Sequence, residues 1–314
     1  MREFELYLQT MRNEGRSETT IRNVKSVVGG FFDIMGIKDI DDIKKLKRTD
    51  IDLYIGKLYD AGNSDSSRQT KINTVRMFFN YLENRDVIDR NILKGVRISV
   101  AKKELYCPTI EEANTIVSMA AKNIDDYAIY YTLLTSGIRV SELINMKVED
   151  ISDGGVMVLG KGKKERYVCL KKKTVDVLRS YIEKTRSRIK IMSEEDFNTN
   201  RFCRFYKSYK SYVEEIRFVM KNNFVFITRI GGRMNENGIN RRCKQLAREA
   251  GVNPDIVSPH KIRHVYATNL LEQGVDMDVI SSLLGHSNVS VTHSVYAKTS
   301  KGRMKEAIEN VNFV

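Results

Sequence analysis

Apolar residues recur at spacings of three and four along the first third of the chain, a pattern typical of helices that bury one face. The clearest run begins after Ser17, a residue suited to cap a helix, and it ends at Gly36. Its apolar positions are Ile21, Val24, Val28, Phe31, Phe32 and Met35. Two similar runs follow, one from Thr49 and one after Ser64. With a short helix at the start, residues 1–95 are predicted to form a compact helical bundle.

A second domain is predicted after an unpatterned basic stretch, residues 96–107, which we interpret as a linker. Thr109, with Glu112 three residues later, forms the sequence signature of a capping box and opens the domain 108–314. Helical periods are expected at 111–122, 126–135, 140–146, 173–185, 236–250, 260–273, 276–284 and 301–311.

Period-two alternation is confined to short segments of this second domain. Residues 156–159 and 166–170 flank a basic turn that contains two glycines, which predicts a β-hairpin, and 224–227 predicts one more strand. The aromatic and basic stretch 186–222 is predicted to be helical, and its aromatic residues could simply pack. The fold class is therefore mainly α with a small β-hairpin or sheet (α+β).

The composition of the chain limits the kinds of molecule that it is expected to bind. The chain of 314 residues is 41% hydrophobic and 30% charged, which is typical of a globular protein, and its net charge of +13 favours polyanionic partners. No apolar run approaches the length of about 18 residues that a membrane span needs. The N-terminus has no signal-peptide core, and the four cysteines are scattered. These features predict a cytoplasmic protein without a membrane partner.

The chemistry-bearing residues gather near the C-terminus, where all four histidines lie between positions 260 and 293. His260 and His264 have the spacing of a zinc-binding helix, but Lys261 occupies the place of the general-base glutamate, so a zinc protease is disfavoured. The alternative interpretation places His260 and Arg263 in the first turn of a helix, where free N–H groups favour phosphate.

Four more candidate residues lie outside that turn. Arg139 is at another helix start, with Glu142 one turn later and able to fix its guanidinium by hydrogen bonding. His286 follows a helix whose terminal glycine is Gly285, and Tyr296 comes ten residues later. Two arginines could neutralise the oxygens of a pentavalent phosphate, and a tyrosine could attack it.

Four motifs occur in the order SGIRVSEL, GKGKKERYV, PHKIRHVYATNLLEQG and LLGHSNVSVTHSVY. Together they resemble the tyrosine recombinase (phage integrase) family, and the small size of the chain favours its Xer-like site-specific recombinases. The N-terminal helices are similar to that family's SAM-like core-binding domain. The resemblance implies the catalytic set Arg139, Lys161, His260, Arg263, His286 and the nucleophile Tyr296, with Glu142 supporting Arg139. Lys163 and Lys164 compete with Lys161 for the role of general acid.

The resemblance implies a C-shaped clamp on double-stranded DNA that exchanges strands through a 3′-phosphotyrosyl bond and a Holliday junction, without metal or other cofactor. The working form would be a homo-tetramer on two sites, monomeric or dimeric when free and associated with the nucleoid when acting. Two segments are assigned on this basis: 186–222 as an insertion and 301–314 as a docking segment. A non-catalytic DNA-binding relative and a nicking-closing enzyme like the type IB topoisomerases stay open as alternatives.

Candidate DNA-binding residues, besides the catalytic set, are Arg68, Lys71, Lys163 and Lys164. Arg68 and Lys71 lie on the polar face of the third predicted helix, where a solvated surface is the simpler interpretation for each residue by itself.

Overall fold

The computed structural model describes residues 1–100, 106–160 and 165–285 and divides the chain into two compact units, Met1–Glu104 and Leu105–Val314. Each unit has its own hydrophobic core and is described separately. The clamp on DNA concerns how the two units are arranged, so it stays a prediction.

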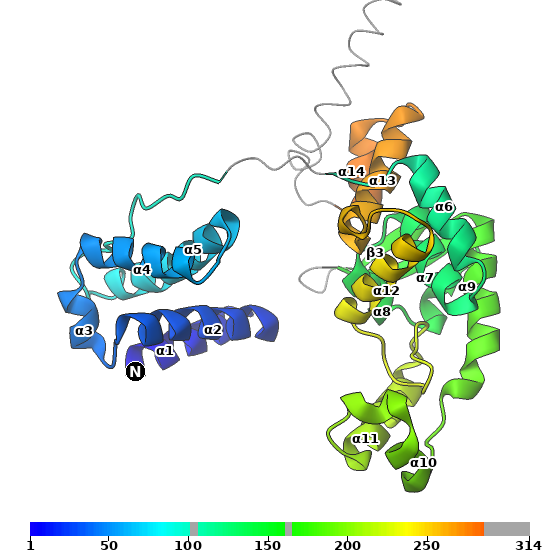
Figure 1. Ribbon diagram of the computed structural model, residues 1–314, viewed down its shortest axis with the longest axis horizontal. Helices are drawn as coiled ribbons and strands as arrows, with labels where there is room; N and C mark the ends of the chain where they lie inside the picture. The colour runs from blue at the N-terminus through cyan, green and yellow to red at the C-terminus, as the bar shows by residue number, and fades with distance from the viewer. Residues whose placement is uncertain (101–105, 161–164, 286–314) are drawn as a thin grey trace, which may run out of the picture. The chain divides into compact units, whose positions relative to one another are not determined.

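The first unit is a bundle of helices, drawn in blue to cyan in Figure 1. Its helices are α1 (Arg2–Asn13), α2 (Glu18–Met35), α3 (Ile40–Lys45), α4 (Arg48–Asp60) and α5 (Asp65–Glu83). The predicted ends of α2 are confirmed, since the Ser17 hydroxyl accepts a hydrogen bond from Thr20 N–H and Gly36 has a φ of +70°. The short helix α3 was not predicted. Its N-cap is Asp39, whose carboxylate accepts from two backbone N–H groups.

Aromatic side chains fill the core of this unit. Phe78 is fully buried, and its ring contacts those of Phe4, Tyr7 and Phe32 with centroids 5.3 to 5.9 Å apart. Burying rings of this size supplies most of the driving force for so small a bundle. The apolar stripes that the sequence shows are therefore the faces that meet in the core.

The second unit is built around the buried helix α7 (Ile124–Ser136), which packs against α6 (Ile110–Ala120), α9 (Lys172–Thr185) and α13 (Pro259–Glu272) (Figure 1). Its other α-helices are α8 (Val140–Asn145), α10 (Glu194–Thr199), α11 (Tyr209–Asn222), α12 (Glu236–Glu249) and α14 (Met277–Leu284). Short 3₁₀ turns are η1 (Val148–Asp150), η3 (Arg186–Arg188), η4 (Arg201–Phe205) and η5 (Pro254–Ile256). The predicted capping box of α6 is present, with Glu112 N–H donating to the Thr109 hydroxyl and Thr109 N–H to the Glu112 carboxylate.

The predicted hairpin is confirmed and gains a third strand. Strands β1 (Ile151–Ser152), β2 (Gly155–Leu159) and β3 (Glu165–Cys169) form an antiparallel sheet in that order. In the register of β2 and β3, Val156 faces Val168 and Val158 faces Arg166. An arginine thus lies on the same face of β3 as a buried valine.

The strand predicted at 224–227 is wrong. Phe224 and Ile227 form only single antiparallel bridges, to Lys147 and Arg233 respectively. All four side chains from 224 to 227 are buried, so the apolar run reflects burial of an irregular segment between helices. Periodicity alone cannot separate these two cases.

The stretch 186–222, predicted to be helical, contains η3, α10, η4 and α11. Within the described residues no helix is long and apolar enough to cross a bilayer.

Candidate active site

Arg139 stands where α7 ends and α8 begins. Gly137 has a φ of +60° and ends α7, which turns the chain so that Arg139 caps α8 two residues later. The Arg139 backbone N–H donates to Glu142 Oε2 and its Nη1 donates to Glu142 Oε1, each at 2.9 Å. The hydrogen bond predicted between these side chains is therefore present. A single carboxylate orients both the backbone and the guanidinium of Arg139.

Glu142 is held by a second guanidinium. Arg166, on β3, donates from Nη2 to Glu142 Oε2 at 2.8 Å and from Nε to Oε1 at 3.3 Å. Burial alone raises the pKa of the Glu142 carboxyl, but hydrogen bonds from Arg166 and Arg139 outweigh burial and hold the pKa below its ordinary value. Glu142, although only 2% exposed, is thus a carboxylate that keeps its charge.

The first turn of α13 carries the histidine and the second arginine. Ser258 caps the helix by accepting from Lys261 N–H at 3.3 Å, and Pro259 is the first helical residue. Arg263 is buried and donates from Nη1 to the Gly137 carbonyl at 2.7 Å, which ties α13 to the turn before Arg139. Burial, then the charges of Arg263 and Arg139, hold the pKa of the His260 imidazole below its ordinary value. His260 therefore lies in the positive field of both arginines.

Three consecutive backbone carbonyl groups at the end of α14 each accept a hydrogen bond from a different arginine. Arg166 Nη1 donates to Leu283 O at 2.7 Å. Arg263 Nη2 donates to Leu284 O. Arg139 Nη2 donates to Gly285 O at 2.9 Å. The C-terminus of a helix carries partial negative charge, so these carbonyls help to offset the three guanidinium charges.

The structure brings together Arg139, Glu142, His260 and Arg263. The other predicted catalytic residues, Lys161, His286 and Tyr296, lie outside the described residues, as do Lys163, Lys164 and the docking segment 301–314. In the sequence Lys161 comes between the residues of β2 and β3, and His286 follows Gly285 directly.

Arg68 and Lys71 belong to the first unit and are engaged there. Arg68 pairs with Asp65 at 2.5 Å and lies 5.0 Å from the centroid of the Tyr59 ring. Lys71 Nζ donates to Asn63 Oδ1 at 2.7 Å. Their predicted contact with DNA stays a prediction.

Arg166 is the residue of this site that the sequence analysis missed. The signal was present in the strand pattern, because Arg166 and Val168 occupy the same face of β3 and a charged residue on an inward face needs a partner. Its partner Glu142 lies 24 residues earlier in the chain, so the pair becomes evident once α8 and the hairpin are packed together.

His260 and His264 contact each other, with their Nε2 atoms 3.1 Å apart. No third His, Cys, Asp or Glu side chain joins this pair to form a metal-binding group within the described residues. The imidazole of His264 is therefore best understood as a neighbour that orients His260.

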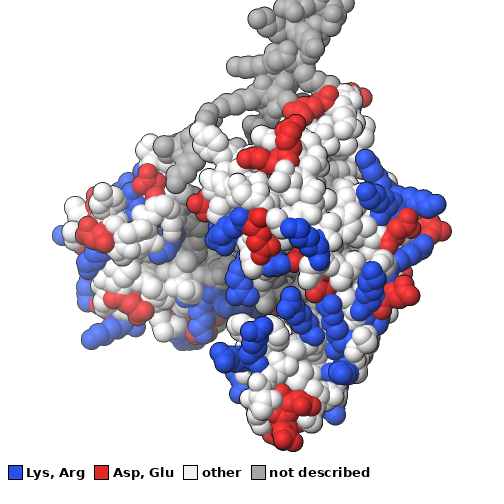
Figure 2. Space-filling model, turned by 45° about the vertical axis from the view of Figure 1, so that its right-hand side comes forward, with Lys and Arg blue, Asp and Glu red and all other residues white. Residues whose placement is uncertain are grey.

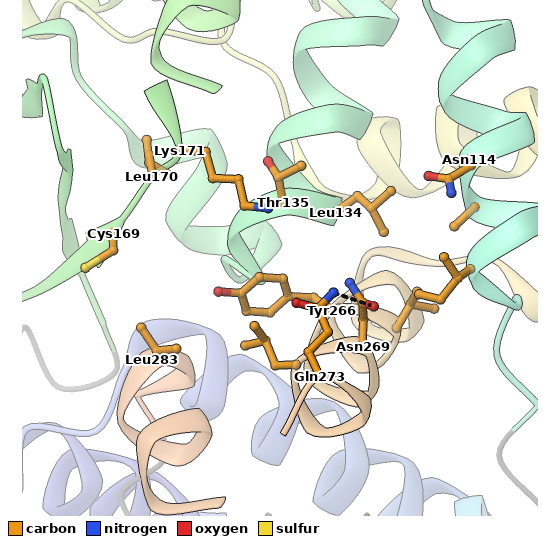
Figure 3. Close-up of a pocket in the computed structure, with 14 residues that line it drawn as sticks. Asn114, Leu134, Thr135, Cys169, Leu170, Lys171, Tyr266, Asn269, Gln273 and Leu283 are labelled. Carbon is orange, nitrogen blue, oxygen red and sulfur yellow. Dashed lines mark hydrogen bonds between the residues drawn. The ribbon is translucent and has the colours of Figure 1, made fainter. Parts of the chain in front are cut away.

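A pocket with a volume of about 390 Å³ lies beside the site, between α6, α7, β3, α13 and α14. Tyr266 lies near its centre in Figure 3, with Leu134 and Thr135 on one side and Cys169 and Leu283 on another. A Cβ atom at Gly137 would lie 2.3 Å from the Tyr266 ring, so the close approach of α13 to the end of α7 requires glycine there.

We expect Glu142→Gln to lower the free energy of unfolding by about 3 kcal/mol at neutral pH, because a buried carboxylate between two guanidinium groups is lost. The pKa of Glu142 is lower in the folded protein, so its contribution is fully present above the ordinary value of 4.5 and is lost as the pH falls through the folded value. Urea unfolding of both proteins from pH 7 to pH 3 should show the difference shrinking below pH 4.5. A constant difference would contradict the proposed charge state.

His260 should titrate below pH 6.5, the ordinary value for the imidazole, because burial and two guanidinium groups disfavour its charged form. Proton–carbon NMR of the histidine rings measures this pKa directly. The signal lost in His260→Gln gives its assignment, and the signal lost in His264→Gln identifies the ring next to it. A pKa above 6.5 would mean that the arginines do not act on this imidazole.

Comparisons with known proteins agree over nearly the whole chain. Residues 108–303 match the phage integrase family, and residues 3–86 match the phage integrase N-terminal SAM-like domain. Tyrosine recombinase XerC of Staphylococcus aureus (strain JH9) is 30% identical, an alignment covering 98% of this chain and 95% of that protein. Tyrosine recombinase XerD of Listeria monocytogenes serovar 1/2a is 27% identical, covering 93% of this chain and 92% of that protein.

Solved structures show the same fold. The Tn1549 transposon integrase in complex with a circular intermediate DNA matches with a TM-score of 0.70 and 16% identity, covering 97% of this chain and 99% of that one. The XerH recombinase bound to its palindromic difH substrate matches with a TM-score of 0.65 and 17% identity, covering 98% of this chain and 83% of that one. Family, relatives and fold converge: the chain belongs to the phage integrase family and is a tyrosine recombinase, an enzyme of site-specific DNA recombination.

Proposed function

We propose that the chain cuts one DNA strand at a time with Tyr296, holds the 3′ end as a phosphotyrosyl ester, and rejoins it to a partner strand. The observation that carries this assignment is the convergence of Arg139, Arg263 and His260 from two separate helices. Two guanidinium groups and an imidazole suit a phosphodiester whose charge grows in the transition state. Because Glu142 and backbone carbonyls hold the two guanidinium groups, these groups need little reorganisation when the phosphate arrives.

Arg139 keeps N–H donors for a ligand. A guanidinium has five N–H donors, and the interactions of Arg139 with Glu142 and Gly285 use two of them. The Arg139 side chain is 35% exposed, whereas Arg263 is only 6% exposed. We therefore assign Arg139 the more direct contact with the phosphate. Arg166 acts as a positioning residue through Glu142.

The proposed reaction balances without an external energy source. The Tyr296 hydroxyl gives its proton to the neutral imidazole of His260 as its oxygen forms a bond to phosphorus. The bond from phosphorus to the 5′ oxygen breaks, and Lys161 supplies the proton that the 5′ oxygen takes up. Attack by the 5′ hydroxyl of a partner strand reverses the step and releases Tyr296. The phosphodiester is conserved throughout, so ATP is not needed, and the cationic side chains supply the charge stabilisation that a metal provides elsewhere.

The assembly proposed for strand exchange is a homo-tetramer on two duplex sites that passes through a Holliday junction, working on the nucleoid in the cytoplasm. The net charge of +13 supports DNA as the partner. The largely apolar pocket around Tyr266 is a suitable acceptor for the docking segment 301–314, whose apolar residues are Met304, Ala307, Ile308 and Val311. Docking within one subunit and docking onto a neighbour both remain compatible with this pocket.

Tyr296→Phe should abolish the covalent protein–DNA product that the unchanged protein forms in the presence of chelator. The substrate is a nicked duplex carrying a site selected from random DNA by binding to Tyr296→Phe, and the product is read on a denaturing gel. Tyr266→Phe is the matched control, because Tyr266 is the tyrosine beside Arg263 and burial raises its pKa. This control should keep the covalent band.

The outcomes separate the alternatives. Loss of the band in Tyr266→Phe alone would identify a different nucleophile. DNA binding with no band in any protein would identify a non-catalytic relative. A two-site plasmid that is relaxed without yielding recombinants would identify a nicking-closing enzyme.

Lys161→Ala should slow the cleavage of ordinary DNA. The rate of cleavage by this variant should be restored on a substrate that has sulfur in place of oxygen at the 5′ bridging position. A thiol has a pKa of about 8.5, so it leaves without a proton from the enzyme. Lys163→Ala and Lys164→Ala are the matched controls, and their rates of cleavage should rise little on the sulfur-containing substrate. Arg139→Ala should also gain little, because it stabilises the phosphate and not the leaving group. Rescue of Lys163→Ala or Lys164→Ala instead would move the general acid to that residue.

A further inference from the structure

Helices α10 and α11 form a lobe at the lower end of the second unit in Figure 1. The lobe has a small core of its own, made of Phe197, Cys203, Tyr212, Ile216 and Ile230. The Tyr212 hydroxyl donates to Lys190 O at 2.9 Å, and the Tyr209 hydroxyl donates to Met192 O at 2.9 Å. The interpretation that aromatic residues of 186–222 simply pack is therefore confirmed for these two tyrosines.

Two phenylalanines of the lobe do not pack in this way. Phe205 is 80% exposed and Phe202 is 37% exposed, both on η4. The guanidinium carbon of Arg201 lies 4.9 Å from the centroid of the Phe202 ring, and that of Arg229 lies 5.8 Å away. Stacking of this kind orients a guanidinium while leaving its N–H edge free to donate.

The segment that carries these rings is basic. From Phe197 to Val213 the sequence contains four basic residues and no Asp or Glu. These four, with Arg229 beside them, define the basic–aromatic strip: Arg201, Arg204, Lys207, Lys210 and Arg229, together with Phe202 and Phe205. All five basic side chains are exposed, and none forms a salt bridge within the described residues.

Other arginines of the same unit differ in this respect. Arg188 pairs with Asp125 at 2.7 Å, and Arg179 pairs with Asp153 at 2.6 Å. Figure 2 shows basic side chains gathered above the lower tip of the molecule and acidic side chains at that tip. In the lobe, the first turn of α10 carries Glu194, Glu195 and Asp196. The positive charge of the strip is thus segregated, a distribution that attracts a polyanion.

The strip adjoins the element that carries Arg139. The chain runs from Arg229 through a tight turn to Arg233, which hydrogen-bonds to the Asn145 side chain at the last residue of α8. Arg139 caps the other end of this six-residue helix, which corresponds to about 9 Å of helix. A duplex bound at Arg139 would therefore extend within reach of the lobe, because each strand of DNA carries a phosphate about every 3.4 Å along the helix axis.

We propose that the basic–aromatic strip is a second DNA-binding surface, which contacts backbone phosphates of the duplex next to the cleavage site. This inference rests on the proposed function. Contacts of this type strengthen binding without reading sequence, and they depend strongly on salt because each one releases counterions. Phe205 adds apolar contact with the sugars, and Phe202 keeps two guanidinium groups oriented.

The test compares two double variants on a 40-base-pair duplex of arbitrary sequence. Arg204→Gln/Lys207→Gln removes two charges from the strip, and Lys172→Gln/Lys184→Gln removes two exposed, unpaired charges from α9. The slope of log K against log salt should fall by about 2 in the strip variant, one unit for each lost phosphate contact. The α9 variant should keep the slope of the unchanged protein. Thermal unfolding of both variants verifies that the fold is intact.

An unchanged slope in the strip variant, or an equal fall in both variants, would overturn the inference. The positive charge of the strip could instead bind an acidic face of a second copy of this chain. Sedimentation of the strip variant tests this by measuring its self-association. Weaker self-association with an unchanged salt slope would assign the strip to that contact and also overturn the inference. The proposed function is judged separately, by whether the unchanged protein binds the duplex and forms the Tyr296 adduct.

Discussion

The structure of the second unit depends on keeping three guanidinium groups close together. Arg139, Arg166 and Arg263 repel one another, and two devices offset that repulsion. One is the buried carboxylate of Glu142, which accepts from Arg139 and Arg166. The other is the last turn of α14, whose carbonyls at 283, 284 and 285 each accept from one of the three. The end of α7, the start of α8, the register of β3 and the end of α14 are all constrained by these contacts.

The same arrangement explains why the site is ready for an anion before one arrives. Arg139 and Arg263 are fixed by groups that belong to the fold, so the entropy of ordering two long side chains is lost on folding and not on binding. The positive field that results also acts on His260, whose imidazole is neutral at a pH where a solvated one begins to take up a proton. A neutral imidazole can share a proton with the reacting oxygens, in either direction.

The sequence predicted local structure well where capping signals are strong. Ser17, Gly36 and Thr109 marked helix ends that the structure has, and the hairpin followed from its alternation and turn. Short elements were missed, because α3 has only six residues and β1 only two. In the site, the contact between Arg139 and Glu142 was predictable from their i, i+3 spacing. The meeting of α8 with α13 is a long-range packing contact, which local patterns do not encode. It was expected only from the family resemblance, and Arg166 was not expected at all.

The lobe of α10 and α11 has a core separate from that of the rest of the unit. Its surface can therefore accumulate or lose charged and aromatic residues without disturbing the packing that holds Arg139, Glu142 and Arg263. Selection for a new length or strength of DNA contact would act on the lobe, while selection on chemistry would act on the arginine network. DNA binding and strand transfer can therefore change independently during evolution of the same polypeptide. We expect the sequences of descendants of this chain to diverge first in the lobe.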